Sequence, residues 1–282
     1  MSEDTPQTMT ETPRAAILGG GVMGGTIVTA LRVAGWPQDR ITVVEKDSVR
    51  AGGLREGHGI EVIDSVSKAV ADADIVVVAV KPHDTAAVLD EMKPSYKEGA
   101  LLFTVVAGLA ASFYESRLPE GTPVVRAMPN TPSIVARGAT AIAAGTHAKD
   151  EHIALSAAML RATGLVVRVD EDQMDAVTAV SGSGPAYFYA MVEALTEAGV
   201  AQGLDRVLAT QLAAQTFVGA AHLLMESGDT PQILRKRVSS PGGTTIAALE
   251  AMEHAGLQGV ISAGANAAAA RSKELAQEFG SN

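Results

Sequence analysis

The chain has 282 residues, enough for one or two domains, and 47% of them are hydrophobic, so a sizeable core can form. Its formal charge of −10 disfavours a general affinity for nucleic acid or anionic membranes, because their phosphate groups would be repelled. The absence of cysteine excludes disulfides, thiolate metal sites and a cysteine nucleophile, and it is compatible with a cytoplasmic location. Residues 1–13 are polar and acidic without a signal-peptide pattern, so we expect a flexible tail.

The first predicted element is a short buried strand over 15–18, which runs directly into a glycine-rich turn. Helical spacing follows over 26–34. A strand, a G-x-G-x-x-G turn and a helix in this order are typical of a dinucleotide-binding site, where the free N–H groups of the helix start hold a pyrophosphate. A glycine-rich turn that binds nothing is the alternative. The predicted cofactor contacts here are Gly19, Gly21, Val22, Met23 and Gly24.

Further apolar runs predict a Rossmann-type α/β domain over residues 14–170. The predicted strands are 41–44, 75–80, 101–106, 123–127, 139–143 and 165–169, with helices over 65–70, 83–92 and 150–162. The run over 75–80 is continuous and β-branched, as in a strand buried on both faces. The alternation of strands and helices predicts a doubly wound, mostly parallel sheet.

The end of the second predicted strand lies where such folds hold the adenosine ribose, about twenty residues past the glycines. Glu45 could accept hydrogen bonds from the ribose hydroxyls of NAD. Lys46, Ser48 and Arg50 could instead hold the 2′-phosphate of NADP. The sequence leaves both cofactors open.

Other predicted strands end in residues that would line the same crevice, because the carboxyl ends of parallel strands meet at one edge of a sheet. Val80, Lys81 and Pro82 end one strand, and Lys81 is placed to meet a phosphate or the nicotinamide. The next strand ends in Ala107-Gly108.

From Glu171 the strand pattern gives way to alanine-rich helices, which predicts an all-α domain over residues 171–282. The predicted helices are 173–180, 185–201, 205–226, 230–235, 244–253 and 256–279. The helix over 205–226 is apolar on more than one face, and such a helix is usually buried. Because this domain is too small to bury the helix alone, we infer an interlocked helical dimer.

Two segments rich in glycine and hydroxyl groups precede helices of this half. They are Ser181-Gly-Ser-Gly-Pro-Ala-Tyr187 and Ser239-Ser-Pro-Gly-Gly-Thr-Thr245. Either could simply cap its helix, or its N–H groups could hold an anion. We expect a small carboxylate to bind the N–H groups of Gly243, Thr244 and Thr245.

No Ser/His/Asp set is evident, and the six histidines show no metal-ligand spacing, so no metal site is predicted. Nicotinamide chemistry remains, in which the protein positions and shields the substrate. Reduction of a ketone usually requires a clear proton donor such as His or Lys. A cyclic imine is already basic, so a hydroxyl-rich site fits an imine better.

Together these segments resemble the pyrroline-5-carboxylate reductase family over nearly the whole chain after the tail. The resemblance rests on Ile17-Leu-Gly-Gly-Gly-Val-Met-Gly24, Ala79-Val-Lys-Pro82, Val106-Ala-Gly108, Arg126-Ala-Met-Pro-Asn-Thr-Pro132 and the two hydroxyl- and glycine-rich segments. Those last two segments are the most specific to the family.

The resemblance implies reduction of L-1-pyrroline-5-carboxylate to L-proline by NADPH or NADH, the last step of proline biosynthesis. It implies that Ser240, Gly242, Gly243, Thr244 and Thr245 bind the substrate carboxylate. The Thr245 hydroxyl would be catalytic, bonding the ring nitrogen. The stretch around Lys81-Pro82 and Ala107-Gly108 would face the nicotinamide, with Asn130 nearby. The family forms dimers through its helical domain, often assembled into a decamer.

Two positions depart from the family pattern. Many relatives carry Asn-Arg-Ser, a 2′-phosphate site, where this chain has Glu45-Lys46-Asp47, so a strict preference for NADP does not follow. Some relatives carry an asparagine where this chain has Ser65-Val66-Ser67. The alternative functions are a dehydrogenase of small hydroxy acids, with Lys81 as acid and base, and a non-catalytic NADP sensor.

Overall fold

The computed structural model describes residues 12–280, so most of the predicted tail over 1–13 lies outside the described residues. The chain forms two compact units, and each is described by itself. Of the described residues, the α/β unit contains 12–182 together with 268–280, and the helical unit spans Ser183–Ala267. The division into compact units falls between Gly182 and Ser183, and it assigns the end of the chain to the α/β unit. The domain boundary predicted between residues 170 and 171 stays a prediction.

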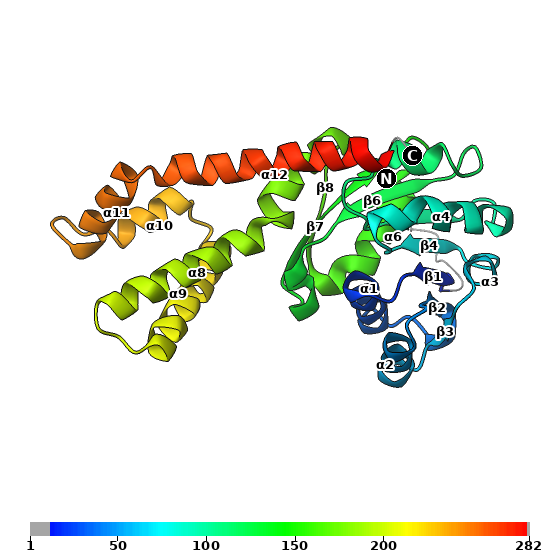
Figure 1. The fold of residues 1–282 in the computed structure, drawn as a ribbon, viewed down its shortest axis with the longest axis horizontal. Coiled ribbons are helices and arrows are strands. Elements are labelled where there is room, and N and C mark those ends of the chain that lie inside the picture. Colours follow the sequence, from blue (N-terminus) through cyan, green and yellow to red (C-terminus); the bar gives the residue numbers. More distant parts are fainter. Residues whose placement is uncertain (1–11, 281–282) are drawn as a thin grey trace, which may run out of the picture. The chain divides into compact units, whose positions relative to one another are not determined.

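The α/β unit is built on one eight-stranded sheet in the order β3-β2-β1-β4-β5-β6-β7-β8 (Figure 1). All neighbouring strands are parallel except β6 and β7. The chain leaves β1 toward β2 and β3 and then resumes on the other side at β4, so the sheet reverses its winding between β1 and β4. The predicted doubly wound, mostly parallel sheet is confirmed. The strands are β1 (Ala15–Leu18), β2 (Ile41–Val44), β3 (Glu61–Ile63), β4 (Ile75–Val78), β5 (Leu101–Thr104), β6 (Val124–Met128), β7 (Gly138–Ala144) and β8 (Gly164–Arg168).

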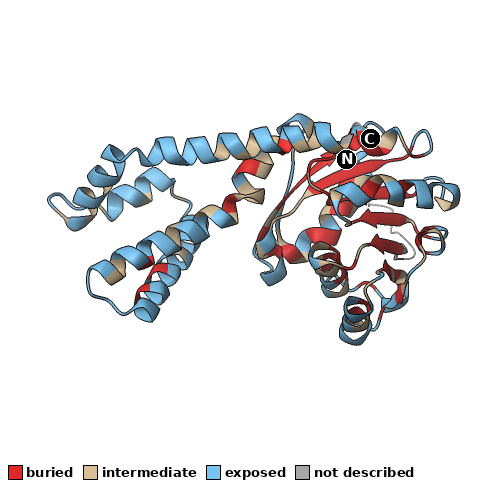
Figure 2. Cartoon of the chain, in the orientation of Figure 1, coloured by how far each residue is buried: buried red, intermediate tan, exposed pale blue. Residues whose placement is uncertain are grey.

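Apolar side chains on both faces of the sheet form the core, because successive strand residues point to opposite sides. Ile17 and Val77, paired in register, pack on the face covered by α1, α2 and α6. Leu18 and Val78 pack on the face covered by α3, α4 and α5. Figure 2 shows this burial in the strands and in the helix faces turned toward them. These helices are α1 (Val22–Val33), α2 (Ser48–His58), α3 (Val66–Val70), α4 (Pro82–Met92), α5 (Ala111–Glu115) and α6 (Asp150–Leu160).

The predicted elements of this unit are present, and three others were not predicted: the neighbouring α2 and β3, and the five-residue helix α5. Helix α2 carries three glycines and little apolar surface, so its sequence shows no helical periodicity. It forms because the Asp47 side chain caps it by accepting a hydrogen bond from Arg50 N at 2.9 Å. Strand β3 has three residues, too few for a period-2 pattern, and pairs with β2 at the sheet edge.

One ion pair is buried between the sheet and the segment that follows β8. The Arg126 side chain on β6 is 6% exposed, and its Nη1 donates to Glu171 Oε1 at 2.7 Å. The same oxygen accepts from Ala111 N at 3.2 Å, which fixes the start of α5. The pair therefore ties three segments of the α/β unit together.

The last part of the chain packs on the α/β unit. Helix α12 (Leu257–Gly280) ends there, and its Ser272 hydroxyl, 4% exposed, donates to Asp175 Oδ1 at 2.7 Å. Phe279 packs against the core on the α3–α5 face. Asp175 lies in α7 (Met174–Val177), which continues into a π-helical turn over Thr178–Gly182.

The helical unit contains α8 (Gly184–Ala201), α9 (Arg206–Ser227), α10 (Pro231–Arg237), α11 (Thr244–His254) and the first part of α12. Helices α8 and α9 form an antiparallel pair. The rings of Phe188 and Phe217 pack edge to face between them, with their centroids 6.0 Å apart. Gly199 and Ala209 meet at close range, since a Cβ built at Gly199 would lie 3.0 Å from that of Ala209.

Figure 2 shows most residues of the helical unit as exposed within one chain, and many of them are large and apolar. On α9, Leu208 is 45% exposed, Leu212 52% and Met225 78%. The prediction of a helix that is apolar on several faces is confirmed. An apolar surface of this extent is typical of an oligomer interface.

Candidate functional site

The glycine-rich turn packs so tightly that two of its glycines have no room for a side chain. A Cβ built at Gly19 would lie 2.7 Å from the carbonyl oxygen of Ala79, and Gly19 has φ of +106°. A Cβ at Gly24 would lie 1.9 Å from the carbonyl oxygen of Gly19. At Gly21, by contrast, a Cβ would meet nothing within 4 Å. The backbone at Gly21 therefore faces open space, where a bulky ligand can approach.

Helix α1 begins at Val22, four residues before the predicted start, so its first turn includes the predicted contacts Val22, Met23 and Gly24. Its N-cap, Gly21, has no side chain to accept the first N–H groups. These groups and the positive end of the helix dipole are thus available to an anion. The turn fits the pyrophosphate of a dinucleotide.

At the end of β2, the predicted ribose-binding residues differ in their environments. The Glu45 side chain is 8% exposed and points back toward the glycine turn, where it accepts a hydrogen bond from Gly20 N at 3.1 Å. Lys46 and Ser48 are exposed. Sequence reasoning missed Gly20: a Cβ there would lie 2.7 Å from Leu54 Cδ1, a contact that no local pattern indicates.

The ends of β4 and β5 lie beside the glycine turn, because β1, β4 and β5 are adjacent in the sheet. Val80 is in contact range of Gly19, and Lys81 is the exposed N-cap residue of α4, with Pro82 in its first turn. Gly108 is buried with φ of +80°, and a Cβ there would lie 3.0 Å from that of Leu275 on α12. The structure thus brings the predicted residues Gly19, Val80, Lys81 and Ala107-Gly108 to one edge of the sheet.

Asn130 joins three segments of the α/β unit. Its Oδ1 accepts from Ala139 N at 2.9 Å, and its Nδ2 donates to the carbonyl oxygen of Ser181 at 3.0 Å. The first of the two glycine segments is therefore no open loop, since Ser181 and Gly182 belong to the π-helical turn that runs into α8. A nicotinamide contact by Asn130 stays a prediction.

The second glycine segment forms a tight turn at the start of α11, in the helical unit. Gly243 N donates to the carbonyl oxygen of Ser240 at 2.9 Å, and Gly242 has φ of +71°, which favours glycine. Gly243 is the N-cap residue and has no side chain, so the first N–H groups of α11 are uncapped. Thr244 and Thr245 are the first two residues of the helix. No side chain caps these N–H groups, and the binding of a carboxylate here stays a prediction.

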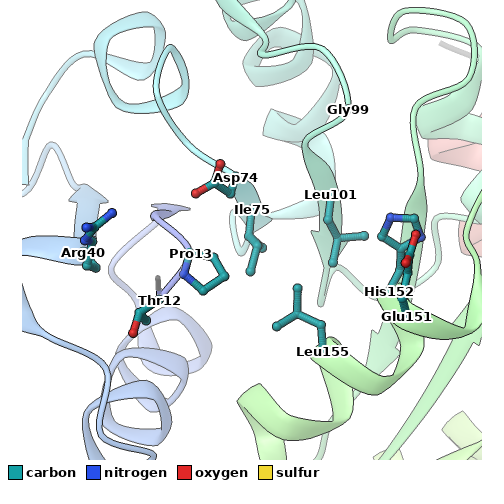
Figure 3. Close-up of a pocket in the computed structure, with 10 residues that line it drawn as sticks. All are labelled: Thr12, Pro13, Arg40, Asp74, Ile75, Gly99, Leu101, Glu151, His152 and Leu155. Atoms are coloured by element: carbon teal, nitrogen blue, oxygen red, sulfur yellow. The ribbon is translucent and has the colours of Figure 1, made fainter. Parts of the chain in front are cut away.

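The α/β unit has two cavities, one at the carboxyl ends of the strands and one at their amino ends. One, of about 570 Å³, begins at Gly20, Gly21 and Val22 and is also lined by Arg50. The other, of about 560 Å³, lies at the amino ends of the strands, where Ile75, Leu101 and Leu155 are flanked by charged groups (Figure 3). No predicted site residue lines that second cavity. Among residues 12–280 no group of His, Asp or Glu could hold a metal ion.

The close fit of Gly24 leads to a prediction with a matched control one residue away. We expect Gly24→Ala to cost about 1–3 kcal/mol of stability and to weaken dinucleotide binding, because its methyl group would displace the Gly19 carbonyl. Gly25→Ala should stabilise α1 by up to about 1 kcal/mol, since a Cβ there would only touch Leu54 Cδ2 at 3.9 Å. Thermal melting and calorimetric titration with NADP⁺ check both variants. Equal behaviour of the two would contradict the close-packing argument.

Comparisons with known proteins agree with this geometry. Residues 171–275 match the family described as pyrroline-5-carboxylate reductase dimerisation, and residues 14–108 match NADP oxidoreductase, coenzyme F420-dependent. The chain is 38% identical over 270 residues to the pyrroline-5-carboxylate reductase of Pseudomonas aeruginosa, covering 95% of this chain and 99% of that protein. The chain belongs to the pyrroline-5-carboxylate reductase family.

Other members of the pyrroline-5-carboxylate reductase family are similarly close. The enzyme of Mycobacterium leprae is 42% identical, with 93% of this chain and 96% of that protein covered. The solved structure of a pyrroline-5-carboxylate reductase from Coxiella burnetii superposes with a TM-score of 0.89 at 36% identity, covering 94% of this chain and 99% of that one. The pyrroline carboxylate reductase of Plasmodium falciparum, solved with NADP bound, superposes with a TM-score of 0.83 at 27% identity, covering 94% of this chain and 99% of that one. The helical unit therefore belongs to a dimerisation domain of this reductase family, and the resemblance predicted from the motifs is confirmed.

Proposed function

We propose that this chain reduces L-1-pyrroline-5-carboxylate to L-proline, with NADPH or NADH as cofactor. The observation that carries the proposal is the uncapped, glycine-built start of α11 in a member of this reductase family that also has an open dinucleotide turn. The bound nicotinamide supplies the hydride that adds to the imine carbon. The chain's residues bind and orient the ring, and they help its nitrogen to keep or gain a proton.

The turn over residues 240–245 is the proposed substrate-binding segment. Its glycines bring backbone N–H groups within reach of a carboxylate, and the dipole of α11 favours a negative charge at this end. Thr245 is half-buried and is the second residue of α11, so it belongs to the same first turn as those N–H groups. In this role Thr245 bonds the ring nitrogen, while Ser240, Gly242, Gly243 and Thr244 bind the carboxylate.

The proposed cofactor contacts are those named from the sequence at the glycine turn and at the ends of β4 and β5, with Lys46 and Ser48 beside the end of β2. Glu45 lies at the same strand end, but its carboxylate is bonded within the protein. Gly21, Val22 and Met23 would hold the pyrophosphate on the start of α1. Lys81 and Ala107-Gly108, at adjacent strand ends, would border the nicotinamide half. The shared edge of the sheet supports this assignment.

The active assembly is proposed to be a homodimer through the helical unit, with dimers able to associate into a decamer. The exposed apolar residues of α8 and α9 support a partner helix surface. By length and composition α9 could also cross a membrane, but the dimerisation match gives its apolar faces another use. The net charge of −10 supports an enzyme without nucleic-acid or anionic-membrane partners, and the absence of cysteine is compatible with the proposed cytoplasmic location.

A steady-state assay tests the proposal. The purified protein should oxidise NADPH or NADH when L-1-pyrroline-5-carboxylate is added, and proline should accumulate in equal amount. Small keto acids should give no turnover. Turnover of a keto acid alone would favour a hydroxy-acid dehydrogenase, and dinucleotide binding without any turnover would favour a sensor.

Gly243→Val should raise the KM for the imine at least about tenfold while leaving dinucleotide affinity unchanged. A Cβ at Gly243 would lie 2.7 Å from Ser240 Oγ and 2.9 Å from the Ser240 carbonyl oxygen, so the turn would have to open. Initial rates over a range of imine concentrations measure the KM, and titration with NADP⁺ serves as the control. An unaltered KM would remove this turn from the substrate site.

A further inference from the structure

Glu45, at the end of β2, has both carboxylate oxygens fully used inside the protein. Oε1 accepts from Asp47 N at 2.8 Å and from Arg50 Nη2 at 3.0 Å. Oε2 accepts from Gly20 N at 3.1 Å and from Arg50 Nε at 3.0 Å. Each oxygen thus has two donors, which is its ordinary capacity. The carboxylate has no lone pair left for the ribose hydroxyls that its position would suggest.

Arg50 forms a bidentate ion pair with this carboxylate. Its side chain is 54% exposed, and its Nη1 lies 3.7 Å from Asp47 Oδ2. It lines the same cavity as Gly20 and Gly21, so it stands beside the pyrophosphate turn. Its positive charge is opposed by two carboxylates, and this cluster of Glu45, Asp47 and Arg50 carries a net charge of about −1.

Glu45 stays ionised near neutral pH. Burial by itself would raise the pKa of Glu45, but the hydrogen bonds from Arg50, Asp47 N and Gly20 N outweigh it and hold that pKa below its usual value. The pair between Glu45 and Arg50 is therefore between two full charges.

We propose that Glu45 is a positioning residue that sets the choice between the two dinucleotides by holding Arg50, and that this Glu45–Arg50 clasp disfavours the 2′-phosphate. The inference rests on the proposed use of NADPH or NADH. In dinucleotide folds, an arginine near the end of the second strand accommodates the 2′-phosphate, whereas an acidic residue there suits the unphosphorylated ribose. Here the acidic residue holds the arginine. A 2′-phosphate would have to take Arg50 from Glu45 and then lie beside a carboxylate whose side chain is only 8% exposed.

Glu45→Gln tests the clasp. The single carbonyl oxygen of glutamine can accept from Arg50 and from one backbone N–H, whereas its NH₂ group can accept from neither, so the charge pair and one of the two bonds to the guanidinium are lost. We expect the ratio of the Kd for NADP⁺ to the Kd for NAD⁺ to fall at least tenfold in this variant. Calorimetric titration of the full-length protein gives both constants without turnover. The same change of ratio should appear with adenosine 2′,5′-bisphosphate against AMP, which carry only the adenosine end.

Two further variants separate selection from a merely structural effect. Glu61→Gln removes the same charge from β3, where Glu61 accepts from Thr42 at 3.0 Å away from the glycine turn, and it should leave the ratio unchanged. Arg50→Gln should raise the ratio, because Glu45 then faces the 2′-phosphate without its partner. Damage to the fold would weaken both dinucleotides together, and thermal melting identifies it.

A ratio that stays within threefold of the original in Glu45→Gln, or that rises, would overturn the clasp as the selecting device. Failure of the unmodified protein to bind either dinucleotide would overturn the proposed function and this inference together. The two failures are therefore distinguishable in one set of titrations.

Discussion

Thr245→Val should lower kcat for imine reduction by roughly ten- to a thousand-fold, as expected when one positioned hydrogen-bond donor is lost. Valine keeps the branched shape at the start of α11 and removes only the hydroxyl. The N–H groups that hold the carboxylate belong to the backbone, so the KM for the imine should change much less than kcat. Thr245→Ala should show the same loss of rate.

Thr245→Ser provides the matched control, since serine restores a hydroxyl at the same place in the first turn of the helix. Its kcat should lie within about tenfold of the original. Initial rates at saturating cofactor over a range of imine concentrations give kcat and the KM for all three variants. Full activity of Thr245→Val would exclude the hydroxyl from the chemistry, whatever the serine variant does.

Arg126→Met should destabilise the α/β unit by about 3 kcal/mol, at the lower end of the range for breaking a buried ion pair. The loss arises because Glu171 keeps its charge without its partner. The Glu171 side chain is 31% exposed, so water can reach it in part and limits the loss. Adding Glu171→Gln to Arg126→Met should recover some of the stability, because no unpaired carboxylate then remains.

Arg168→Met provides the comparison for Arg126→Met. Arg168 pairs with Asp150 at 2.7 Å, but the two side chains are 55% and 89% exposed, so this pair should contribute about 1 kcal/mol or less. Urea unfolding followed by the fluorescence of Trp36, the single tryptophan of the chain and a buried residue of the α/β unit, measures both. An equal loss of unfolding free energy in Arg126→Met and Arg168→Met would contradict the assignment of Arg126 to the core.

The sequence predicted the sheet well because its strands are continuous apolar runs buried on both faces, as at Ile75–Val78. It predicted the glycine turn because spacing and context are local. It missed α2 and β3, which depend on the Asp47 cap and on pairing with β2. It also missed the short helix α5, whose start is held by Glu171 from 60 positions away. It left Glu45 as a candidate ribose ligand, since the bond to Gly20 joins residues 25 positions apart. The contact of Gly108 with Leu275 was equally beyond any local pattern.

The return of α12 to the α/β unit makes the helical unit an insertion in the chain rather than an appendage. A chimaera that exchanged this unit between relatives would need two junctions, one near residue 182 and one near residue 268. A shortened chain that stopped before Ala268 would lose the covering of Gly108 and the Ser272–Asp175 bond, and so would uncover the strand ends proposed to border the nicotinamide. The carboxyl-terminal helix α12 is thus a structural part of both units, since it begins in the helical unit and ends in the α/β unit.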